Sequence, residues 1–307
     1  MSLIVKNIIK TYDKGNVLAL DNVSFEVKQG ERFGIIGPDG AGKTSLFRIL
    51  TTLLLADSGV ASVCGNDVVL GFDKIRRISG YMPGKFSLYQ DLSVEENLNF
   101  FATVFGTTVA ENMHLIKDIY VQIEPFKDRP AGKLSGGMKQ KLALCCALIH
   151  EPKILFLDEP TTGVDPVSRK EFWDMLDRLK SRNITILVST PYMDEASRCD
   201  RIALMQTGKI LAIDTLDNII GSYKNKVFGV ETRQMHQLSQ FFKTHKAVHS
   251  CYPFGDTLHV TPKDALLTSI ELESSCKSAG FQDVKVFDIV PNIEDIFMNL
   301  MGQNNGI

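Results

Sequence analysis

The chain has 307 residues, of which 44% are hydrophobic and 23% charged, and its formal net charge is -2 at pH 7. This length allows two domains or one large one, and the composition is ordinary for a globular protein. The near-neutral charge excludes a general electrostatic attraction to nucleic acid or anionic lipid, although a local basic patch could still exist.

We expect neither a signal peptide nor a membrane span. Lys6 interrupts the apolar start of the chain before a signal-peptide hydrophobic region could form. No apolar run approaches the ~20 residues of a spanning helix, so a role at a membrane would require a partner protein. The six cysteines lack paired metal-ligand spacing and are expected to be reduced thiols in the cytosol, with Cys145 and Cys146 in the core.

The first elements in chain order are short strands, expected at residues 3–5, 18–20 and 23–27 with turns between them. Tyr12 precedes the first turn. Its ring could stack on the face of an adenine, or it could be a half-buried tyrosine at the end of a strand, and the sequence does not separate the two.

Residues 37–45 match the phosphate-binding loop pattern G-x-x-x-x-G-K-[ST]. A buried strand is expected before it, at residues 32–36, and a helix with an apolar face after it, at residues 45–50. Glycines let backbone N–H groups surround a polyphosphate, and the helix start adds partial positive charge. The expected phosphate-binding residues are Gly37, Pro38, Asp39, Gly40, Ala41, Gly42, Lys43, Thr44 and Ser45.

Two of these side chains have specific expected tasks. Lys43 is placed to reach the β- and γ-phosphates, and Thr44 offers a hydroxyl to Mg²⁺. The plain alternative is a glycine-rich helix start that binds no ligand.

A helix with a capping box, Ser93 at the N-cap and Glu96 three residues later, opens a helical region that extends to about Ile123. Further on, Ser135, Gly136 and Gly137 form a turn before an apolar helix. Such a turn is a possible second anion site, and it is also a common plain turn.

Residues 153–160 predict a buried strand that ends in two carboxylates, Asp158 and Glu159. Ligands of parallel α/β sheets bind at that edge. Asp158 is placed to hold Mg²⁺ through water, and Glu159 to orient and polarise an attacking water for phosphoryl transfer. The alternative is a solvated acid pair at a strand end. A turn containing Asp165 follows, then a helix in which Trp173 is expected to pack.

The pattern changes near residue 222. Strand, helix, two strands, helix and strand follow, which predicts a small ferredoxin-like α+β unit with a further helix at residues 293–301. Its histidines, His236, His245, His249 and His259, have no ligand spacing and are expected to lie on the surface or in the core.

The order of the phosphate loop, Ser135-Gly136-Gly137, Asp158-Glu159 and Asp165 resembles the ATP-binding subunit of an ABC transporter over roughly residues 3–220. Within that family, residues 163–166, 193–196 and 291–297 resemble the type-2 exporters of drugs, lipids or polysaccharides. Asp39 and residues 190–192 resemble ATPases encoded or fused in pairs that work with a membrane-fusion adaptor protein.

This resemblance implies a P-loop α/β ATPase fold at residues 1–222, with a mixed sheet core, an N-terminal antiparallel β subdomain and a helical subdomain at about 87–150. Residues 223–307 would be the α+β appendage. Two ATPase subunits, as a homodimer or heterodimer, would enclose ATP and Mg²⁺ between the phosphate loop of one and Ser135-Gly136-Gly137 of the other. Asp165 would be a further nucleotide-binding residue. They would drive transmembrane permease subunits through a cleft near residues 81–100, at the cytoplasmic face of the cell membrane.

The sequence departs from the family pattern at two positions. Gly84 stands where the family has Gln after the strand of Tyr81, with Gln90 displaced by six positions, and Pro191 stands where it has a switch His. Pro191 cannot donate a proton or a hydrogen bond. We therefore expect ATP binding with slow hydrolysis at this chain's own loop, completed by a more active partner ATPase.

Two other functions compete with an energy-coupling ATPase. One is an ATP-dependent dimerisation module with little turnover. The other is a nucleic-acid-linked ABC ATPase, which the single cassette, the short span of residues 45–134 and the near-neutral charge disfavour, so we expect no nucleic-acid partner.

Overall fold

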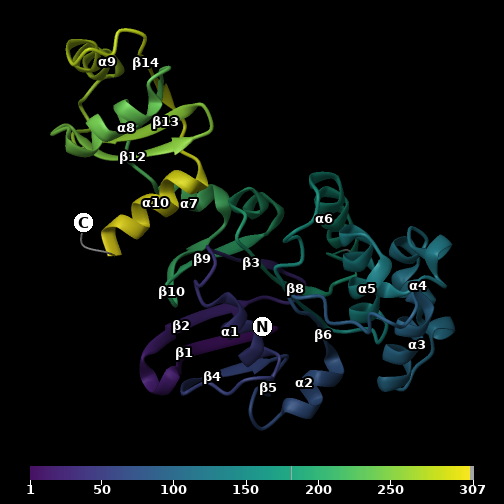
Figure 1. Cartoon of the computed structure of the whole chain (residues 1–307). Helices are drawn as coiled ribbons and strands as arrows, with labels where there is room; N and C mark the ends of the chain where they lie inside the picture. Colours follow the sequence, from purple (N-terminus) through teal and green to yellow (C-terminus); the bar gives the residue numbers. More distant parts are fainter. Residues whose placement is uncertain (181, 305–307) are drawn as a thin grey trace. The chain divides into compact units, whose positions relative to one another are not determined.

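The computed structural model describes residues 1–180 and 182–304. The chain forms two compact units that divide between Leu216 and Asp217 (Figure 1). The change of sequence pattern near residue 222 lies slightly beyond this division, at the end of helix α7 (Leu216–Ser222). Within the described residues, every helix is too short or too polar to cross a lipid bilayer.

An antiparallel sheet begins the N-terminal unit. Its strands, in spatial order, are β2 (Val17–Val27), β1 (Leu3–Tyr12), β4 (Ser58–Val63) and β5 (Asn66–Asp67). The expected strands at 18–20 and 23–27 are one strand, β2, in which Asn22 has φ 56°. Bulges shift the β1–β2 register at several points. These irregularities break the period-two pattern, so the sequence indicated separate short strands.

The central sheet places the expected site residues at one edge. Its strands, in spatial order, are β10 (Lys209–Asp214), β9 (Arg201–Gln206), β3 (Arg32–Ile36), β8 (Thr185–Thr190), β7 (Ile154–Asp158) and β6 (Ser79–Met82). All neighbours are parallel except β10 and β9. Ile36 pairs with Thr190, and Asp158 pairs with Ser189. The carboxyl ends of β3, β7 and β8 therefore meet at the same edge.

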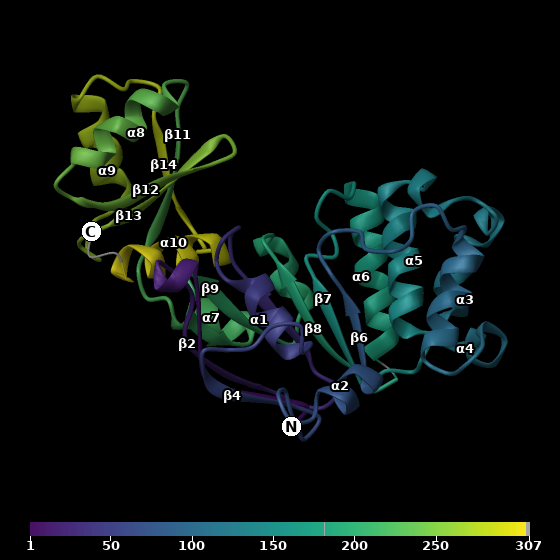
Figure 2. The ribbon, with the colours of Figure 1, turned by 60° about the horizontal axis from the view of Figure 1, so that its bottom comes forward.

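Helix α1 (Lys43–Leu50) lies between the N-terminal sheet and the central sheet (Figure 2). Its Leu46 and Phe47 are fully buried, and they share one apolar cluster with Leu3 of β1 and Phe156 of β7. The Phe47 and Phe156 rings meet edge to face with centroids 6.3 Å apart. This packing fixes the helix start, and hence the phosphate loop, relative to both sheets.

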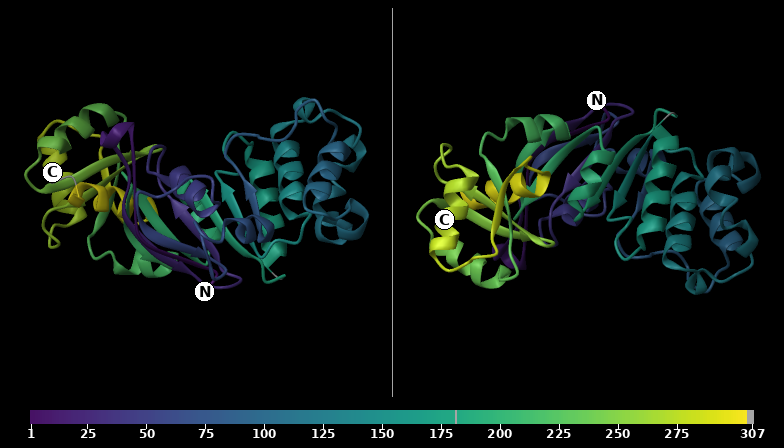
Figure 3. Two further views of the ribbon diagram at one scale, coloured as in Figure 1. Left: turned by 90° about the horizontal axis from the view of Figure 1, so that it is seen from below. Right: turned by 90° about the horizontal axis from the view of Figure 1, so that it is seen from above.

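Four longer helices gather at one end of the N-terminal unit (Figure 3): α3 (Val94–Val104), α4 (Val109–Tyr120), α5 (Gly136–Leu148) and α6 (Pro166–Lys180). The capping box of Ser93 and Glu96 is present. The helical region to residue 123 is interrupted at Gly106, with φ 73°, and Thr108 caps α4 in a second capping box. Cys145, Cys146 and Trp173 are buried as expected, and all six cysteines are free.

Shorter helical segments complete this unit: α2 (Phe72–Ile78) and the 3-10 turns η1 (Asp13–Gly15), η2 (Glu124–Phe126), η3 (Ala131–Lys133) and η4 (Met193–Arg198).

The C-terminal unit has the expected ferredoxin-like topology. Its antiparallel strands, in spatial order, are β12 (Val248–Phe254), β13 (Thr257–Pro262), β11 (Val227–Glu231) and β14 (Lys285–Ile289). Its helices are α8 (Met235–Thr244), α9 (Ser269–Ser278) and α10 (Ile293–Asn304). Phe228, Leu238, Val260 and Leu272 belong to its own apolar cluster, so this unit has a separate core.

Candidate active site

The phosphate loop connects β3 to α1, and its glycines are required by space and by backbone conformation. Gly40 and Gly42 have φ 79° and 103°, in the left-handed region that favours glycine. A Cβ atom on Gly37 would lie 2.0 Å from the Met205 carbonyl oxygen, and one on Gly42 would lie 2.3 Å from that of Ala19. The glycines of the sequence motif therefore allow a loop that no other residue could form here.

Lys43 is buried at the base of this loop. Its Nζ donates to the carbonyl oxygens of Gly37 and Pro38 at 2.7 and 2.9 Å, and it forms an ion pair with Glu159 Oε1 at 3.0 Å. The residue is only 3% exposed. The structure thus brings together the two side chains that the sequence predicted as catalytic.

Asp158 at the end of β7 is buried and held by hydroxyl groups. Ser189 Oγ donates to its Oδ1 at 2.7 Å. Burial raises the pKa of Asp158, while hydrogen bonds from Ser189 and Thr44 act in the opposite direction. Thr44 and Asp158, the two expected Mg²⁺ ligands, are therefore adjacent.

Glu159 turns away from the strand in a left-handed conformation, with φ 52°. Its backbone N–H donates to the carbonyl oxygen of Ser189 at 3.1 Å and to Ser189 Oγ at 3.0 Å. Such a conformation costs a non-glycine residue roughly 1–2 kcal/mol, so these hydrogen bonds and the Lys43 pair hold a strained residue in place.

Ser189 contacts both acids, and sequence reasoning did not identify it as a site residue. A signal existed: Ser189 and Thr190 are polar residues that end an otherwise apolar strand. Only the strand order shows that this strand lies between β3 and β7.

Tyr12 also lies at the phosphate loop. Its hydroxyl is 3.1 Å from Ser45 Oγ at the start of α1, and the residue is 37% exposed. The hydroxyl thus contacts the loop while part of the ring remains accessible. Adenine stacking on this ring stays a prediction.

The side chains of Ser135 and Asp165 accept hydrogen bonds from backbone N–H groups at the starts of their own helices. Ser135 Oγ accepts from Met138 N–H at the start of α5, and Asp165 Oδ1 accepts from Val167 and Ser168 N–H at the start of α6. These backbone donors lower the pKa of Asp165. A Cβ on Gly137 would lie 2.6 Å from Ser168 Oγ, so the two turns pack together. The contact of the Ser135 turn with nucleotide in a second subunit stays a prediction, as does nucleotide binding by Asp165.

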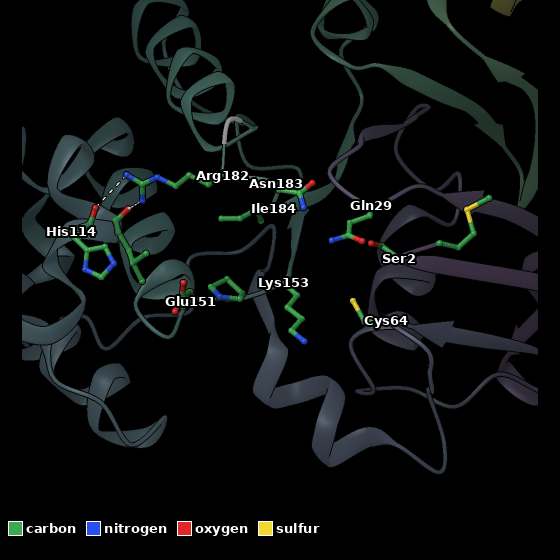
Figure 4. A pocket seen from close by; sticks show the side chains of 12 residues that line it. Ser2, Gln29, Cys64, His114, Glu151, Lys153, Arg182, Asn183 and Ile184 are labelled. Carbon is green, nitrogen blue, oxygen red and sulfur yellow. Dashed lines mark hydrogen bonds between the residues drawn. The ribbon is translucent and has the colours of Figure 1, made fainter.

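A further cavity lies elsewhere (Figure 4). It has a volume of about 900 Å³ and is lined by Lys153, Asn183 and Ile184, which precede β7 and β8, and by Ser2 and Cys64, which flank strands β1 and β4 of the N-terminal sheet. It therefore lies at the amino edge of the central sheet, opposite the phosphate loop. Arg182 extends from it to the carbonyl oxygens of His114 and Leu115.

Within residues 1–180 and 182–304, no group of three or more His, Cys, Asp and Glu side chains could hold a metal ion by itself. The donor set of Thr44 and Asp158 nevertheless fits Mg²⁺, which prefers a few protein oxygens together with substrate phosphates.

Known proteins are similar to this chain in sequence and in fold. Residues 20–162 match the family model described as ABC transporter. The probable multidrug ABC transporter ATP-binding protein YbhF of Escherichia coli is 44% identical over 208 residues, which cover 67% of this chain and 36% of that protein. The chain thus matches only about a third of that relative's length.

Another relative matches nearly end to end. The Nod factor export ATP-binding protein I of Burkholderia orbicola is 32% identical over 305 residues, covering 97% of this chain and 96% of that protein.

Solved structures agree with these relatives. An ATP-binding cassette dimer in a post-hydrolysis state with ADP and Pi is 27% identical, with a TM-score of 0.63 over 70% of this chain and 98% of that chain. The structure of cbiO1 from Clostridium perfringens is also 27% identical, with a TM-score of 0.64 over 72% of this chain and 91% of that chain. The chain therefore belongs to the family of ABC transporter ATP-binding proteins.

Proposed function

We propose that this ATPase powers an exporter at the cytoplasmic face of the cell membrane. In this proposal it forms a head-to-tail dimer with a second ATPase subunit or a second copy, and it drives separate permease subunits, with a membrane-fusion adaptor as a possible further partner. The names of the relatives support export: one is a probable multidrug transporter protein and another is a Nod factor export protein.

The observation that carries the proposal is the convergence of Lys43, Asp158 and Glu159 at one sheet edge. Backbone N–H groups of the loop and Lys43 would bind the ATP phosphates, and Thr44 and Asp158 would hold Mg²⁺. The metal supplies positive charge that neutralises phosphate oxygens as phosphoryl transfer proceeds. Because phosphates compete for Lys43, ATP would free the Glu159 carboxylate to orient and polarise water.

We also propose that hydrolysis at this chain's own loop is slow. A Cβ on Gly84 would lie 3.1 Å from the Asp158 carbonyl oxygen and 3.8 Å from the Glu159 Cβ. Gly84 therefore adjoins both acids and offers them no side chain. Gln90 lies against η3 instead: its backbone carbonyl accepts from Gly132 N–H, and a Cβ on Gly132 would lie 3.5 Å from its side-chain Oε1. Losing one charge-assisted contact costs about 1.5–3 kcal/mol, or roughly tenfold to hundredfold in rate.

A cleft offers a place for a permease segment. It has a volume of about 530 Å³ and lies between the end of β6 and helices α3 and α5. Tyr81, Leu88, Phe101 and Phe105 give it a largely apolar lining. An amphipathic segment of a permease would bury its apolar face there.

The test is the double variant Gly84→Gln with Pro191→His in the full chain, with Gly84→Ala and Pro191→Ala as the matched control. We expect the Gln and His pair to raise turnover roughly tenfold to hundredfold, and the alanine pair to leave it unchanged. If the alanine pair raised turnover as much as the Gln and His pair, the missing polar side chains would not be the cause of slow hydrolysis. If ATP still produced dimers but neither pair raised turnover, the chain would be an ATP-dependent dimerisation module.

A further inference from the structure

Glu195 is a buried carboxylate that the chemistry described above does not use. It lies in η4, just beyond β8, and is only 2% exposed. Burying a carboxylate is costly unless hydrogen bonds or an opposite charge compensate it. The partners that compensate it come from three separate segments.

Each oxygen of Glu195 receives a buried hydroxyl. Thr161 Oγ1 donates to Oε1 at 2.9 Å, and Thr190 Oγ1 donates to Oε2 at 2.5 Å. The Arg169 guanidinium Nε lies 3.2 Å from Oε1 and completes the site with a positive charge. Thr161 and Thr190 are 1% and 0% exposed, so water does not compete for these contacts.

The three partners belong to segments that the reaction uses. Thr161 lies two residues after Glu159, in the turn where Thr162 N–H donates to the Glu159 carbonyl oxygen. Thr190 precedes Pro191, and its carbonyl oxygen accepts from Gly37 N–H of the phosphate loop at 3.2 Å. Arg169 lies in the first turn of α6, where its N–H donates to the Asp165 carbonyl oxygen.

Arg169 extends the same network to the surface. Its guanidinium lies 4.4 Å from the centroid of the Tyr192 ring and pairs with Asp194, whose side chain is 68% exposed. Tyr192 N–H in turn donates to Thr190 Oγ1. The segment around Pro191 is therefore held by Glu195 and Arg169.

We propose that Glu195 is a positioning residue for ATP hydrolysis. Its carboxylate holds the Glu159 turn, the Pro191 segment and the Asp165 turn in fixed positions relative to one another. It touches no reacting atom and acts through Thr161, Thr190 and Arg169. The role of the Asp165 turn rests on the proposed head-to-tail dimer, in which the Ser135-Gly136-Gly137 turn, packed against it at Ser168, meets the partner subunit. A change at the dimer face would then reach Glu159 through this carboxylate.

The sharpest test is Glu195→Gln. Glutamine keeps the shape but has one acceptor oxygen where glutamate has two, so one of the two threonine hydroxyls must lose its acceptor. The matched control is Asp194→Asn, which weakens the exposed pair of the same Arg169 and touches neither threonine. Single-turnover hydrolysis and ATP affinity would be measured in the full chain, well below the melting temperature of each variant.

We expect Glu195→Gln to slow single-turnover hydrolysis roughly tenfold with ATP affinity changed less than about threefold, and Asp194→Asn to change neither by more than about twofold. Thr161→Val should slow hydrolysis as much as Glu195→Gln does. Thr161→Ser should hydrolyse ATP at the rate of the parent chain, because it keeps the hydroxyl that donates to Glu195. This rescue separates positioning from a loss of folding.

Equal hydrolysis rates in Glu195→Gln and the parent chain would overturn the inference, as would a variant in which only the melting temperature falls. The proposed dimer is checked separately, as ATP-dependent dimerisation of the Glu159→Gln chain in light scattering. If the Glu159→Gln chain does not dimerise with ATP, the proposed assembly is refuted. If it dimerises but Glu195→Gln hydrolyses ATP at the rate of the parent chain, only the positioning role is refuted.

Discussion

The two edges of the central sheet differ in the environment of their polar side chains, which are buried and bonded to one another at one edge and line a cavity at the other. At the carboxyl edge, Lys43, Asp158 and Ser189 are buried and tied to one another, and Glu159 is held in a strained conformation. At the amino edge lies a cavity of about 900 Å³, with Lys153 and Arg182 in its lining. The carboxyl edge of such sheets is where ligands bind.

The cavity at the amino edge lies away from the proposed ATP site, so cavity volume alone does not identify that site. Buried charge and backbone strain are costly, so they persist where the surrounding structure holds them for a purpose. We therefore expect substitutions at the carboxyl edge to change chemistry and those at the amino edge to change stability.

A matched pair of lysine variants gives the largest contrast between the edges. Lys43→Ala removes the phosphate-binding cation and the partner of Glu159, so turnover should fall on the order of a hundredfold to a thousandfold. Lys153→Ala removes a lysine at the opposite edge and should change turnover less than about twofold. Steady-state phosphate release measures both, and similar losses in the two variants would remove the distinction between the edges.

At the amino edge, His150 is expected to make the free energy of unfolding depend on pH. Its Nε2 lies 3.1 Å from the Ser79 carbonyl oxygen, and its ring stacks on Phe105 with centroids 3.7 Å apart. Burial lowers the pKa of His150 to about 4. The unfolded chain takes up this proton near pH 6.5, so it binds more protons than the folded chain between pH 6.5 and 4. Stability should therefore fall as pH drops through that window.

The size of this effect is on the order of 3 kcal/mol. His150→Phe keeps the stacking and removes the proton site, so it should flatten the pH dependence of the free energy of unfolding between pH 6.5 and 4. Urea unfolding at several pH values measures this. An unchanged slope in the variant would show that His150 is not the group responsible.

Ser189→Ala tests whether the carboxyl edge needs its hydroxyl support. The change removes a hydrogen bond to Asp158 and one to the backbone of Glu159, so turnover should fall roughly tenfold while the fold is kept. Turnover and circular dichroism together check this. A rate equal to that of the parent chain would show that the acids are positioned without Ser189.

Tyr12 should give the smallest effect. Tyr12→Phe removes only the contact with Ser45 and should weaken ATP binding less than about threefold, whereas Tyr12→Ala also removes the ring and should weaken it roughly tenfold. Calorimetric titration with ATP in the hydrolysis-deficient Glu159→Gln background measures both. Equal affinities for Phe and Ala variants would exclude adenine stacking on this ring.

The sequence predicted the parts of the site that follow from local pattern. The phosphate loop needs its glycines for close backbone approach, and the acids Asp158 and Glu159 follow a fully apolar strand, so both appear in a short stretch of sequence. The ferredoxin-like order of the C-terminal unit was also predicted, because its strands and helices alternate with clear turns.

What the sequence did not predict depends on strand order and long-range contacts. Ser189 meets Asp158 across 31 positions, and Glu195 meets Thr161 across 34. The break at Gly106 was missed because helical periodicity continues on both sides of it. The polar end of the β8 strand is the one local sign of these features, and it does not show which residues Ser189 contacts.

The measurement that tests the central claim most directly is ATP affinity and Mg-ATPase turnover of the purified chain, alone and with its partner ATPase and permease. We predict tight ATP binding and slow turnover alone, then fast turnover in the complex. Fast turnover of the chain alone would contradict this account: it would show that Gly84 and Pro191 are no handicap, and that the chain works as a self-sufficient homodimer.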